Sequence, residues 1–156
     1  VLAALAEWGR AEVDEHGRLI GIHGLTLGRT RHSIDQDGAA HHTWCAFDSI
    51  GIPAALGITA TARTDCAACG RALAVEISQG VPAELPFVIW IPGGDCADLR
   101  VDFCAHADMY CSPDHLARRI DTATTPGDAV GLADAASLGR ATWADVASGS
   151  ETRDRA

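Results

Sequence analysis

Cys45 and Asp48 stand three positions apart in a segment that follows a β-prone stretch and precedes a small, apolar run. If a helix begins at this point, the two side chains lie on one face, within reach of proton transfer. A cysteine at a helix start feels the partial positive charge of unpaired backbone N–H groups, which favours the thiolate. We therefore expect the pKa of Cys45 to lie below that of a free thiol, with a proton carrier beside it.

Cys45 alone would more often be a small buried hydrophobic residue than a nucleophile. Asp48 beside it and Cys104 further along the chain favour a reactive site. An ionised Asp48 would oppose the thiolate, whereas a carboxyl group kept protonated by apolar surroundings would not, and it would also supply a proton. His106, two positions after Cys104, is interpreted as a hydrogen-bonding partner rather than a metal ligand.

Cys66 and Cys69 have the spacing of half a zinc ribbon or of a redox pair. A ribbon requires a second such pair, which the sequence lacks, and a thioredoxin-type pair would begin a helix rather than join two strands. Three interpretations stay open: structural thiols in a turn, accessory metal ligands, or a redox pair. Alternation between solvent and interior explains the remaining weak cluster, His32, His41 and His42, as well as metal binding does.

The length of 156 residues suits one domain, expected over residues 1–147, with a disordered polar tail over 148–156. The formal net charge of −9 argues against nucleic acid or an anionic membrane as a partner. No apolar run reaches the roughly 18 residues of a membrane span. The six cysteines would suit a disulfide framework in a secreted protein, but no export signal is present, so we expect reduced, working thiols in a cytoplasm.

Helices and strands must position these residues. The order in which they are predicted along the chain indicates an α+β fold with a mixed or antiparallel sheet flanked by short helices. Apolar spacing and capping signals predict helices at Leu2 to Val13, at Phe47 to Leu56, after Ser112, and at 132–146 following a Thr-rich loop. Alternation predicts strands at 18–27, 40–45, 58–64, 72–78 and 87–91. Asp37-Gly38 predicts a hairpin turn, and residues 97–104 are ambiguous between helix and strand.

Four blocks follow one another along the chain: Trp44-Cys45-Ala46-Phe47-Asp48, Pro53-Ala54-Ala55-Leu56-Gly57, Cys66-Ala67-Ala68 with Gly70, and Phe103-Cys104-Ala105-His106. In this order they resemble the alkylmercury (organomercurial) lyase family, and the resemblance covers roughly residues 15–146. The family's N-terminal winged-helix-like module is mostly absent, with the helix at residues 1–15 as its expected remnant.

The resemblance implies an enzyme of mercury resistance and detoxification that cleaves carbon–mercury bonds by protonolysis, giving a hydrocarbon and Hg(II). Cys45 and Cys104 match the family's two essential thiols, and Asp48 matches the carboxylate that moves the proton. All three would contact mercury as substrate or product, since soft thiolates suit a soft ion. Cys66 matches a further cysteine that is usually read as structural.

The family requires no cofactor, only external thiols for turnover. The implied partners are a small organomercurial and, as acceptors of Hg(II), low-molecular-weight thiols or a mercuric reductase, with neither nucleic acid nor a membrane involved. The chain departs from the pattern at Ala105, where a second cysteine is frequent, and at Asp108, where a histidine is common. Cys69 and Cys111 lie outside the pattern and are interpreted as extra mercury traps or oxidation-prone bystanders.

Two other functions remain open at this point. A non-catalytic domain that binds or senses a soft metal (Hg or Cu) would use Cys45 and Cys104 without depending on Asp48. A redox protein would instead use Cys66 and Cys69. Product formation from an organomercurial separates the first of these from the lyase.

Overall fold

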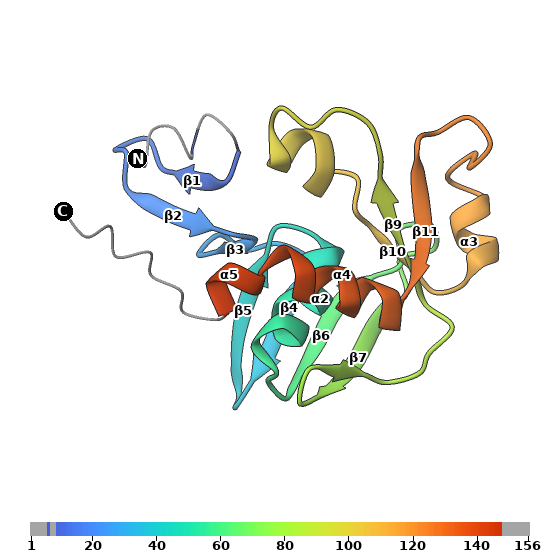
Figure 1. Ribbon diagram of the computed structural model, residues 1–156, viewed down its shortest axis with the longest axis horizontal. Helices are drawn as coiled ribbons and strands as arrows, with labels where there is room; N and C mark the ends of the chain where they lie inside the picture. The colour runs from blue at the N-terminus through green and yellow to red at the C-terminus, as the bar shows by residue number, and fades with distance from the viewer. Residues whose placement is uncertain (1–5, 7–8, 148–156) are drawn as a thin grey trace.

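The computed structural model describes residue 6 and residues 9–147. Its strands form two sheets with antiparallel pairing throughout, joined by short helices, which confirms the predicted α+β class (Figure 1). The larger sheet contains β1 (Ala11–Val13), β2 (Leu19–Ile22), β3 (Leu25–Thr26), β4 (Ser33–Gln36), β5 (Ala39–Thr43), β6 (Ala60–Asp65), β7 (Ala72–Ser78) and β8 (Val81–Pro82). The smaller sheet contains β9 (Val88–Pro92), β10 (Met109–Tyr110) and β11 (Gly127–Gly131).

The larger sheet has the order β1-β2-β3-β5-β4-β6-β7-β8 and the smaller one β10-β9-β11. The helices are α2 (Ala46–Leu56), α3 (Pro113–Ala117), α4 (Leu132–Thr142) and α5 (Ala144–Ala147), with a π-helix, η1 (Leu99–Cys104). Figure 1 shows α2 and α4 side by side against the larger sheet, with the smaller sheet and η1 beside them. Strands β2, β3, β5, β6, β7 and β9 lie close to the predicted ranges.

Local sequence signals explain the best predicted elements. Asp37 and Gly38 both adopt positive φ, 50° and 82°, as the tight turn between β4 and β5 requires. In β7 the side chains alternate between exposed and buried, so Leu73, Val75 and Ile77 point into the core. The predicted hairpin of β6 and β7 is confirmed.

The central helix α2 is buried along most of its length, from Ala46 to Ala54. A helix that is apolar on all sides is stable only inside a core, and α2 obtains that environment between the larger sheet and α4. The two helices approach closely because Gly51 and Gly139 face each other. A Cβ atom on Gly139 would lie 2.2 Å from the Cα of Gly51.

Three sequence-based expectations need correction or lie outside the described residues. Residues 11–13 form β1 rather than the end of the helix predicted at Leu2 to Val13, because they pair with β2; residues 1–5 and 7–8 of that helix are not described. Gly127–Gly131, in the region predicted as a loop, forms β11 by pairing with the buried strand β9. The tail over 148–156 is not described, and the single domain stays a prediction.

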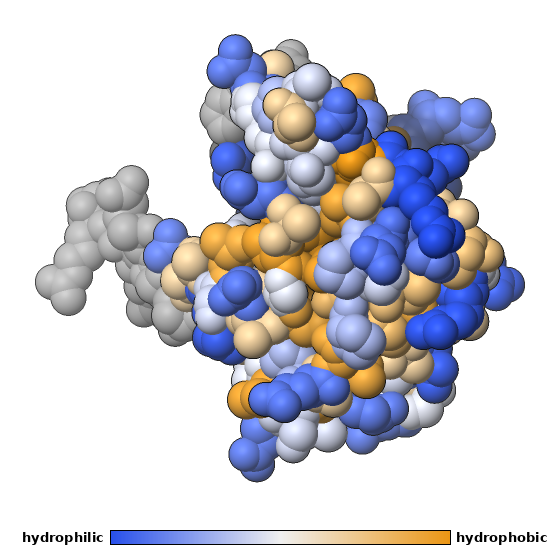
Figure 2. Space-filling model, turned by 90° about the vertical axis from the view of Figure 1, so that its right-hand side faces the viewer, coloured by the Kyte–Doolittle hydropathy of each residue, from blue (hydrophilic) through white to orange (hydrophobic). Residues whose placement is uncertain are grey.

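Most large apolar side chains of the described chain lie in one core cluster. Figure 2 shows the side of the molecule that carries β11 and α3, where apolar residues reach the surface between polar ones. Among the described residues, no helix has the length and apolar character needed to cross a membrane.

Candidate functional site

Cys45 lies at the junction between β5 and α2. It is the N-cap residue of α2, with extended backbone angles, and its side chain is fully buried. Its backbone N–H donates a hydrogen bond to Oδ2 of Asp48 at 3.1 Å. The spacing of three therefore places thiol and carboxyl group at the first turn of one helix, as predicted.

Cys104 is the last residue of η1, and its side chain lies beside Asp48. Its Sγ lies 4.0 Å from Oδ2 of Asp48, and its side chain is 7% exposed. One ligand atom each from Cys45, Asp48 and Cys104 lie within 4.8 Å of one another. We call these three residues the thiol–acid site; the structure brings together the residues that the sequence analysis singled out.

Backbone hydrogen bonds hold Cys104 against α2. The carboxylate of Asp98 caps η1 by accepting from the backbone N–H groups of Arg100 and Val101. After Cys104, the carbonyl oxygen of Ala107 accepts from the N–H of Ala46, the first residue of α2, at 3.1 Å. Short π-helical segments are frequent at functional sites, and η1 positions the thiol of Cys104 in this one.

Gly24 contacts the acid of the site from the loop between β2 and β3. Its carbonyl oxygen accepts from the N–H of Trp44 at 2.8 Å, and its φ is +94°. A Cβ atom at this position would lie 2.7 Å from Cγ of Asp48, so no larger residue fits without displacing the carboxyl group. The local sequence gives no signal for this role of Gly24, because the approach of its loop to α2 is a tertiary contact.

Burial controls the protonation of the site. It raises the pKa of Asp48 from its ordinary 3.8 to about 7, against the lowering effect of hydrogen bonds with Cys45. Burial also raises the pKa of Cys45 well above its ordinary 9.0, and the hydrogen bond with Cys104 and the charge of Asp48 add to this. The expected low pKa of Cys45 is therefore wrong, because loss of water outweighs the helix start. The raised pKa of Asp48 agrees in direction with the expected protonated acid.

Cys104 lies between two cavities of different character. One, of about 270 Å³, is apolar, is lined by Phe47, Phe103 and Trp143, and reaches Asp48 and Cys104. The ring of Phe47 stacks on Trp143 with centroids 5.5 Å apart and meets Phe103 edge-on at 5.7 Å. A larger cavity of about 400 Å³ beside β2, β3 and β5 is not lined by any cysteine, so no thiol can react with a molecule bound there.

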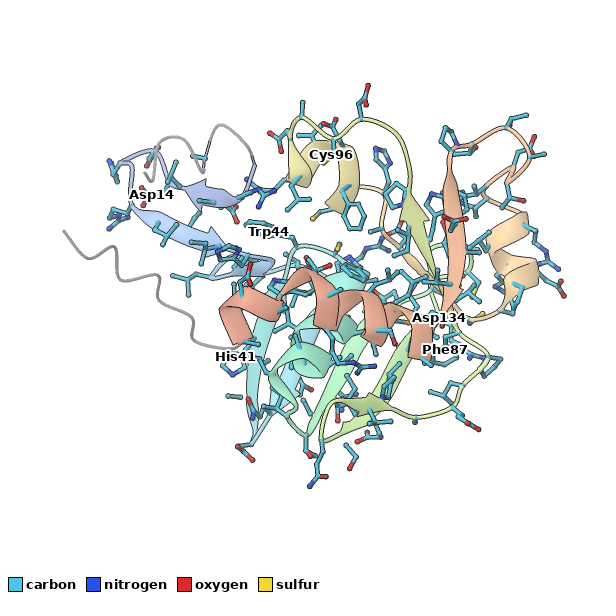
Figure 3. The ribbon with its side chains drawn as sticks, in the orientation of Figure 1. Asp14, His41, Trp44, Phe87, Cys96 and Asp134 are labelled. Atoms are coloured by element: carbon cyan, nitrogen blue, oxygen red, sulfur yellow. The ribbon has the colours of Figure 1, made fainter. Side chains whose placement is uncertain are left out.

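The second cavity beside Cys104 is polar and has a volume of about 210 Å³. Trp44, labelled in Figure 3, lies between the N-terminal strands and η1. Its Nε1 donates to Glu12 at 3.1 Å, and the Arg100 guanidinium lies 5.5 Å from its ring centroid. Arg100 also pairs with Glu12 at 3.1 Å, which joins both walls of this cavity.

The remaining cysteines are not part of the thiol–acid site. Cys66 and Cys69 occupy the connection between β6 and β7, where the fold adds Cys111 and His115 to them. Although burial raises the pKa of Cys66, hydrogen bonds from the backbone of Cys111, the side chain of His115 and the turn itself lower it to about 6. Cys96 is exposed on the loop before η1 (Figure 3).

The histidines do not contribute to the thiol–acid site. Buried His32 places Nδ1 2.7 Å from Oγ1 of Thr64, and burial together with the charge of Arg31 lowers its pKa to about 4. Within the described residues, neither His41 nor His42 joins a group of potential metal ligands. His106 joins no group of potential metal ligands among the described residues, in agreement with the prediction. Its side chain is exposed and makes no hydrogen bond to any described residue, so the predicted hydrogen-bonding role is wrong.

Two buried thiols with an acid beside them, on an α+β scaffold, define a protein suited to a thiophilic ion. Residues 25–144 match the family model described as MerB: Alkylmercury lyase. This chain belongs to the alkylmercury lyase family.

Curated relatives support that assignment. An alkylmercury lyase from Pseudomonas putida is 37% identical over 107 residues, covering 65% of this chain and 50% of the relative. One from Streptomyces lividans is 34% identical over 119 residues, with coverages of 73% and 54%. One from Bacillus cereus is 29% identical over 133 residues, with coverages of 83% and 60%. The chain thus spans 50–60% of the length of these relatives.

The fold is also similar to a solved structure. A crystal structure described as the mercury-bound form of MerB2 superposes with a TM-score of 0.81 at 21% sequence identity. The match covers 91% of this chain and 73% of that chain. The arrangement of sheets and helices described above is therefore the fold of that protein.

Proposed function

We propose that this chain cleaves the carbon–mercury bond of organomercurials by protonolysis, using Cys45, Cys104 and Asp48. The observation that carries the proposal is the convergence of two thiols and one carboxyl group within 4.8 Å in a buried site. Membership of the alkylmercury lyase family supports it. The alternative, a domain that only binds or senses a soft metal, requires the thiols but no acid with a raised pKa beside them.

The reaction begins with thiol exchange. One site cysteine replaces the external thiolate on R–Hg, and that thiolate leaves with the cysteine's proton. The second site cysteine then transfers its proton to ionised Asp48 while its sulfur bonds to mercury. Mercury now has two sulfur ligands and the organic group, and two thiolates push electron density into the bond to carbon.

Asp48 then returns the proton. Its protonated carboxyl group protonates the carbon as the carbon–mercury bond breaks, and the electron pair of that bond becomes the new C–H bond. The products are a hydrocarbon and Hg(II) on two site sulfurs, with Asp48 ionised again. Mercury remains Hg(II) throughout, so the reaction needs neither an electron donor nor a cofactor.

The pKa of Asp48, about 7, suits both halves of this cycle. A group that titrates near the working pH accepts and donates a proton at similar cost. An ordinary exposed aspartic acid, with a pKa of 3.8, would remain ionised after meeting a thiol. Burial thus turns a weak base into a proton shuttle.

The two cavities beside Cys104 suit the two kinds of molecule that must enter. The apolar cavity lined by Phe47, Phe103 and Trp143 fits the organic group of the substrate. The polar cavity gives an external thiol a route to the sulfur of Cys104. Two such thiols, from small molecules or from a mercuric reductase, would remove Hg(II) and restore both cysteines; that acceptor and a cytoplasmic location stay predictions.

The test is product formation. Phenylmercury is incubated with the protein and excess small thiol, and benzene is measured by gas chromatography. We expect catalytic benzene release by the unaltered chain, loss of release in Asp48→Ala with mercury still bound, and no loss in Asp128→Ala, which removes an exposed carboxylate on β11. Mercury binding by the unaltered chain without benzene would support the binding domain instead and end the lyase proposal.

A further inference from the structure

We propose that a second metal site, for a structural Zn²⁺ ion, is formed by four side chains of this chain: Cys66, Cys69, Cys111 and His115. We call these residues the hairpin cluster, because the first two lie in the connection between β6 and β7. The cluster shares no residue with the thiol–acid site and performs no step of the mercury chemistry.

The four potential ligand atoms already face a common centre. All lie within 4.8 Å of one another. Nδ1 of His115 lies 3.2 Å from Sγ of Cys111 and 3.7 Å from Sγ of Cys66. The sulfurs of Cys69 and Cys111 are 4.0 Å apart.

These separations match a tetrahedral zinc site. Zn²⁺ lies about 2.3 Å from a thiolate sulfur and about 2.0 Å from a histidine nitrogen, and tetrahedral angles then separate ligand atoms by about 3.5–3.8 Å. Three cysteines and one histidine are a common structural set for this ion, and the spacings Cys-x2-Cys and Cys-x3-His are typical of its ligands. All four ligands come from the protein, so no open position is left for a substrate.

The surroundings of the sulfurs are also those of a metal site. The backbone N–H of Cys111 points at Sγ of Cys66, 3.4 Å away, which stabilises a thiolate there. The N–H of Gly70 donates to the carbonyl oxygen of Cys66 at 2.8 Å, and its φ of +72° closes the turn that brings Cys69 back. The Ser112 side chain caps α3 and so fixes the backbone that carries His115.

A disulfide explains this arrangement less well than an ion does. All four cysteines outside the thiol–acid site are free thiols in the structure, including Cys69 and Cys111. A disulfide between those two would require their sulfurs to close from 4.0 Å to about 2.0 Å. It would also leave Cys66 and His115 facing the same point with no function. One tetrahedral ion uses all four groups.

The position of the hairpin cluster indicates what the ion would stabilise. It joins the β6–β7 connection of the larger sheet to the end of β10 and to α3, a junction where the N–H of Ala67 also donates a hydrogen bond to the carbonyl oxygen of Met109. Two residues before Met109, Ala107 is bonded to the start of α2. The ion would thus fix the segment that runs from the smaller sheet back to Cys104.

Metal content tests the site directly. The whole chain is produced with zinc in the medium, dialysed, and measured by plasma mass spectrometry. We expect about one zinc per chain, and the same content in Cys45→Ser/Cys104→Ser, which removes the thiols of the other site. Cys69→Ser and His115→Ala lose most of the metal, whereas Cys96→Ser, which alters an exposed cysteine outside both sites, retains it.

A second measurement removes ambiguity from misfolding. Cys69 is exposed, so its replacement by serine should leave the circular dichroism spectrum unchanged. Replacing zinc with Co²⁺ in the unaltered chain should give the visible absorption of tetrahedral thiolate coordination, and a chelator should abolish it and lower the melting temperature by at least about 5 °C. The proposal is overturned if the unaltered chain retains no zinc, or if Cys69→Ser and His115→Ala keep it.

Discussion

The thiol–acid site and the hairpin cluster both gather cysteines around one point, yet they surround their sulfur atoms differently. Cys45, Asp48 and Cys104 are buried, and burial raises the pKa of Cys45 and of Asp48. In the hairpin cluster, backbone N–H groups and a histidine face the sulfurs and lower the pKa of Cys66 to about 6, although burial raises the pKa of Cys111. The first environment favours the protonated forms of Cys45 and Asp48, whereas the second favours the thiolate of Cys66.

That difference in protonation suits the thiol–acid site to catalysis and the hairpin cluster to binding a structural ion. Protonolysis requires a proton at the place where the carbon–mercury bond breaks, so groups that retain protons are useful there. A structural ion requires thiolates and a complete ligand set, and a proton would compete with it. The same residue type therefore serves two purposes according to burial and hydrogen bonding.

The largest expected effect separates the two sites by function. Cys104→Ser should lower benzene release by at least about 1,000-fold, because a hydroxyl group is a poor ligand for mercury and a poor nucleophile. Its zinc content should not change. Cys69→Ser should show the opposite pattern, with zinc lost and turnover reduced less than about tenfold. Equal loss of turnover in both variants would show that the two groups act as one site.

The pKa of Asp48 makes a prediction about stability. Between pH 3.8 and about 7 the folded chain binds a proton at Asp48 that the unfolded chain has lost, so this group lowers stability as the pH rises through that window. Asp48→Asn removes the effect. The free energy of unfolding of Asp48→Asn minus that of the unaltered chain should increase by roughly 3 kcal/mol between pH 5 and pH 8.5.

Urea denaturation at several pH values measures this difference. Asp128→Asn is the control, since it removes an exposed carboxylate, and its stability should follow that of the unaltered chain. A difference between Asp48→Asn and the unaltered chain that is independent of pH would mean that Asp48 titrates normally and is no proton reservoir.

Gly24→Ala should affect the thiol–acid site alone. The added Cβ would lie 2.7 Å from Cγ of Asp48, so the carboxyl group must shift, and a displacement of this size at a reacting group costs about 100-fold in rate. Gly38→Ala is the matched control, with a similar φ of +82° but no atom within 4 Å of the new Cβ. Comparison of kcat for the two variants separates the effect of the contact with Asp48 from that of backbone strain. Equal kcat values would show that the close approach of Gly24 to Asp48 does not affect catalysis.

The smallest expected effect concerns the scaffold behind the thiol–acid site. Gly139→Ala would place a Cβ 2.2 Å from the Cα of Gly51 and force α4 away from α2, at a cost of about 1–3 kcal/mol in the free energy of unfolding. Gly131→Ala, with nothing within 4 Å of its Cβ, should cost less. Zinc content should be the same in both variants, because the hairpin cluster does not depend on that helix pair.

The sequence was sufficient where the determining interactions are local. Cys45 and Asp48 are three residues apart at a helix start, and Asp37-Gly38 defines its hairpin by backbone preference alone. Cys104 could be placed with them only through the family resemblance, because its approach depends on a π-helix and on a bond between Ala107 and Ala46. The sign of the pKa shift of Cys45 was missed, since burial is a property of the whole fold.

Tertiary structure also explains the missed elements. Gly127–Gly131 has little strand propensity and becomes β11 because it pairs with β9. The sequence contains Cys111-x3-His115, a spacing typical of zinc ligands, but only the packing of β10 and α3 brings it to Cys66 and Cys69. The signal in the sequence is a Cys-x2-Cys pair followed by a Cys-x3-His pair, rather than two Cys-x2-Cys pairs.

The most direct test of the central claim is a single turnover. One equivalent of phenylmercury is added to the chain without external thiol, benzene is quantified, and the bound mercury is examined by X-ray absorption. The account predicts one benzene per chain and Hg(II) held by two sulfur atoms, with neither result in Cys104→Ser. Phenylmercury retained intact on one sulfur, with no benzene formed, would contradict it.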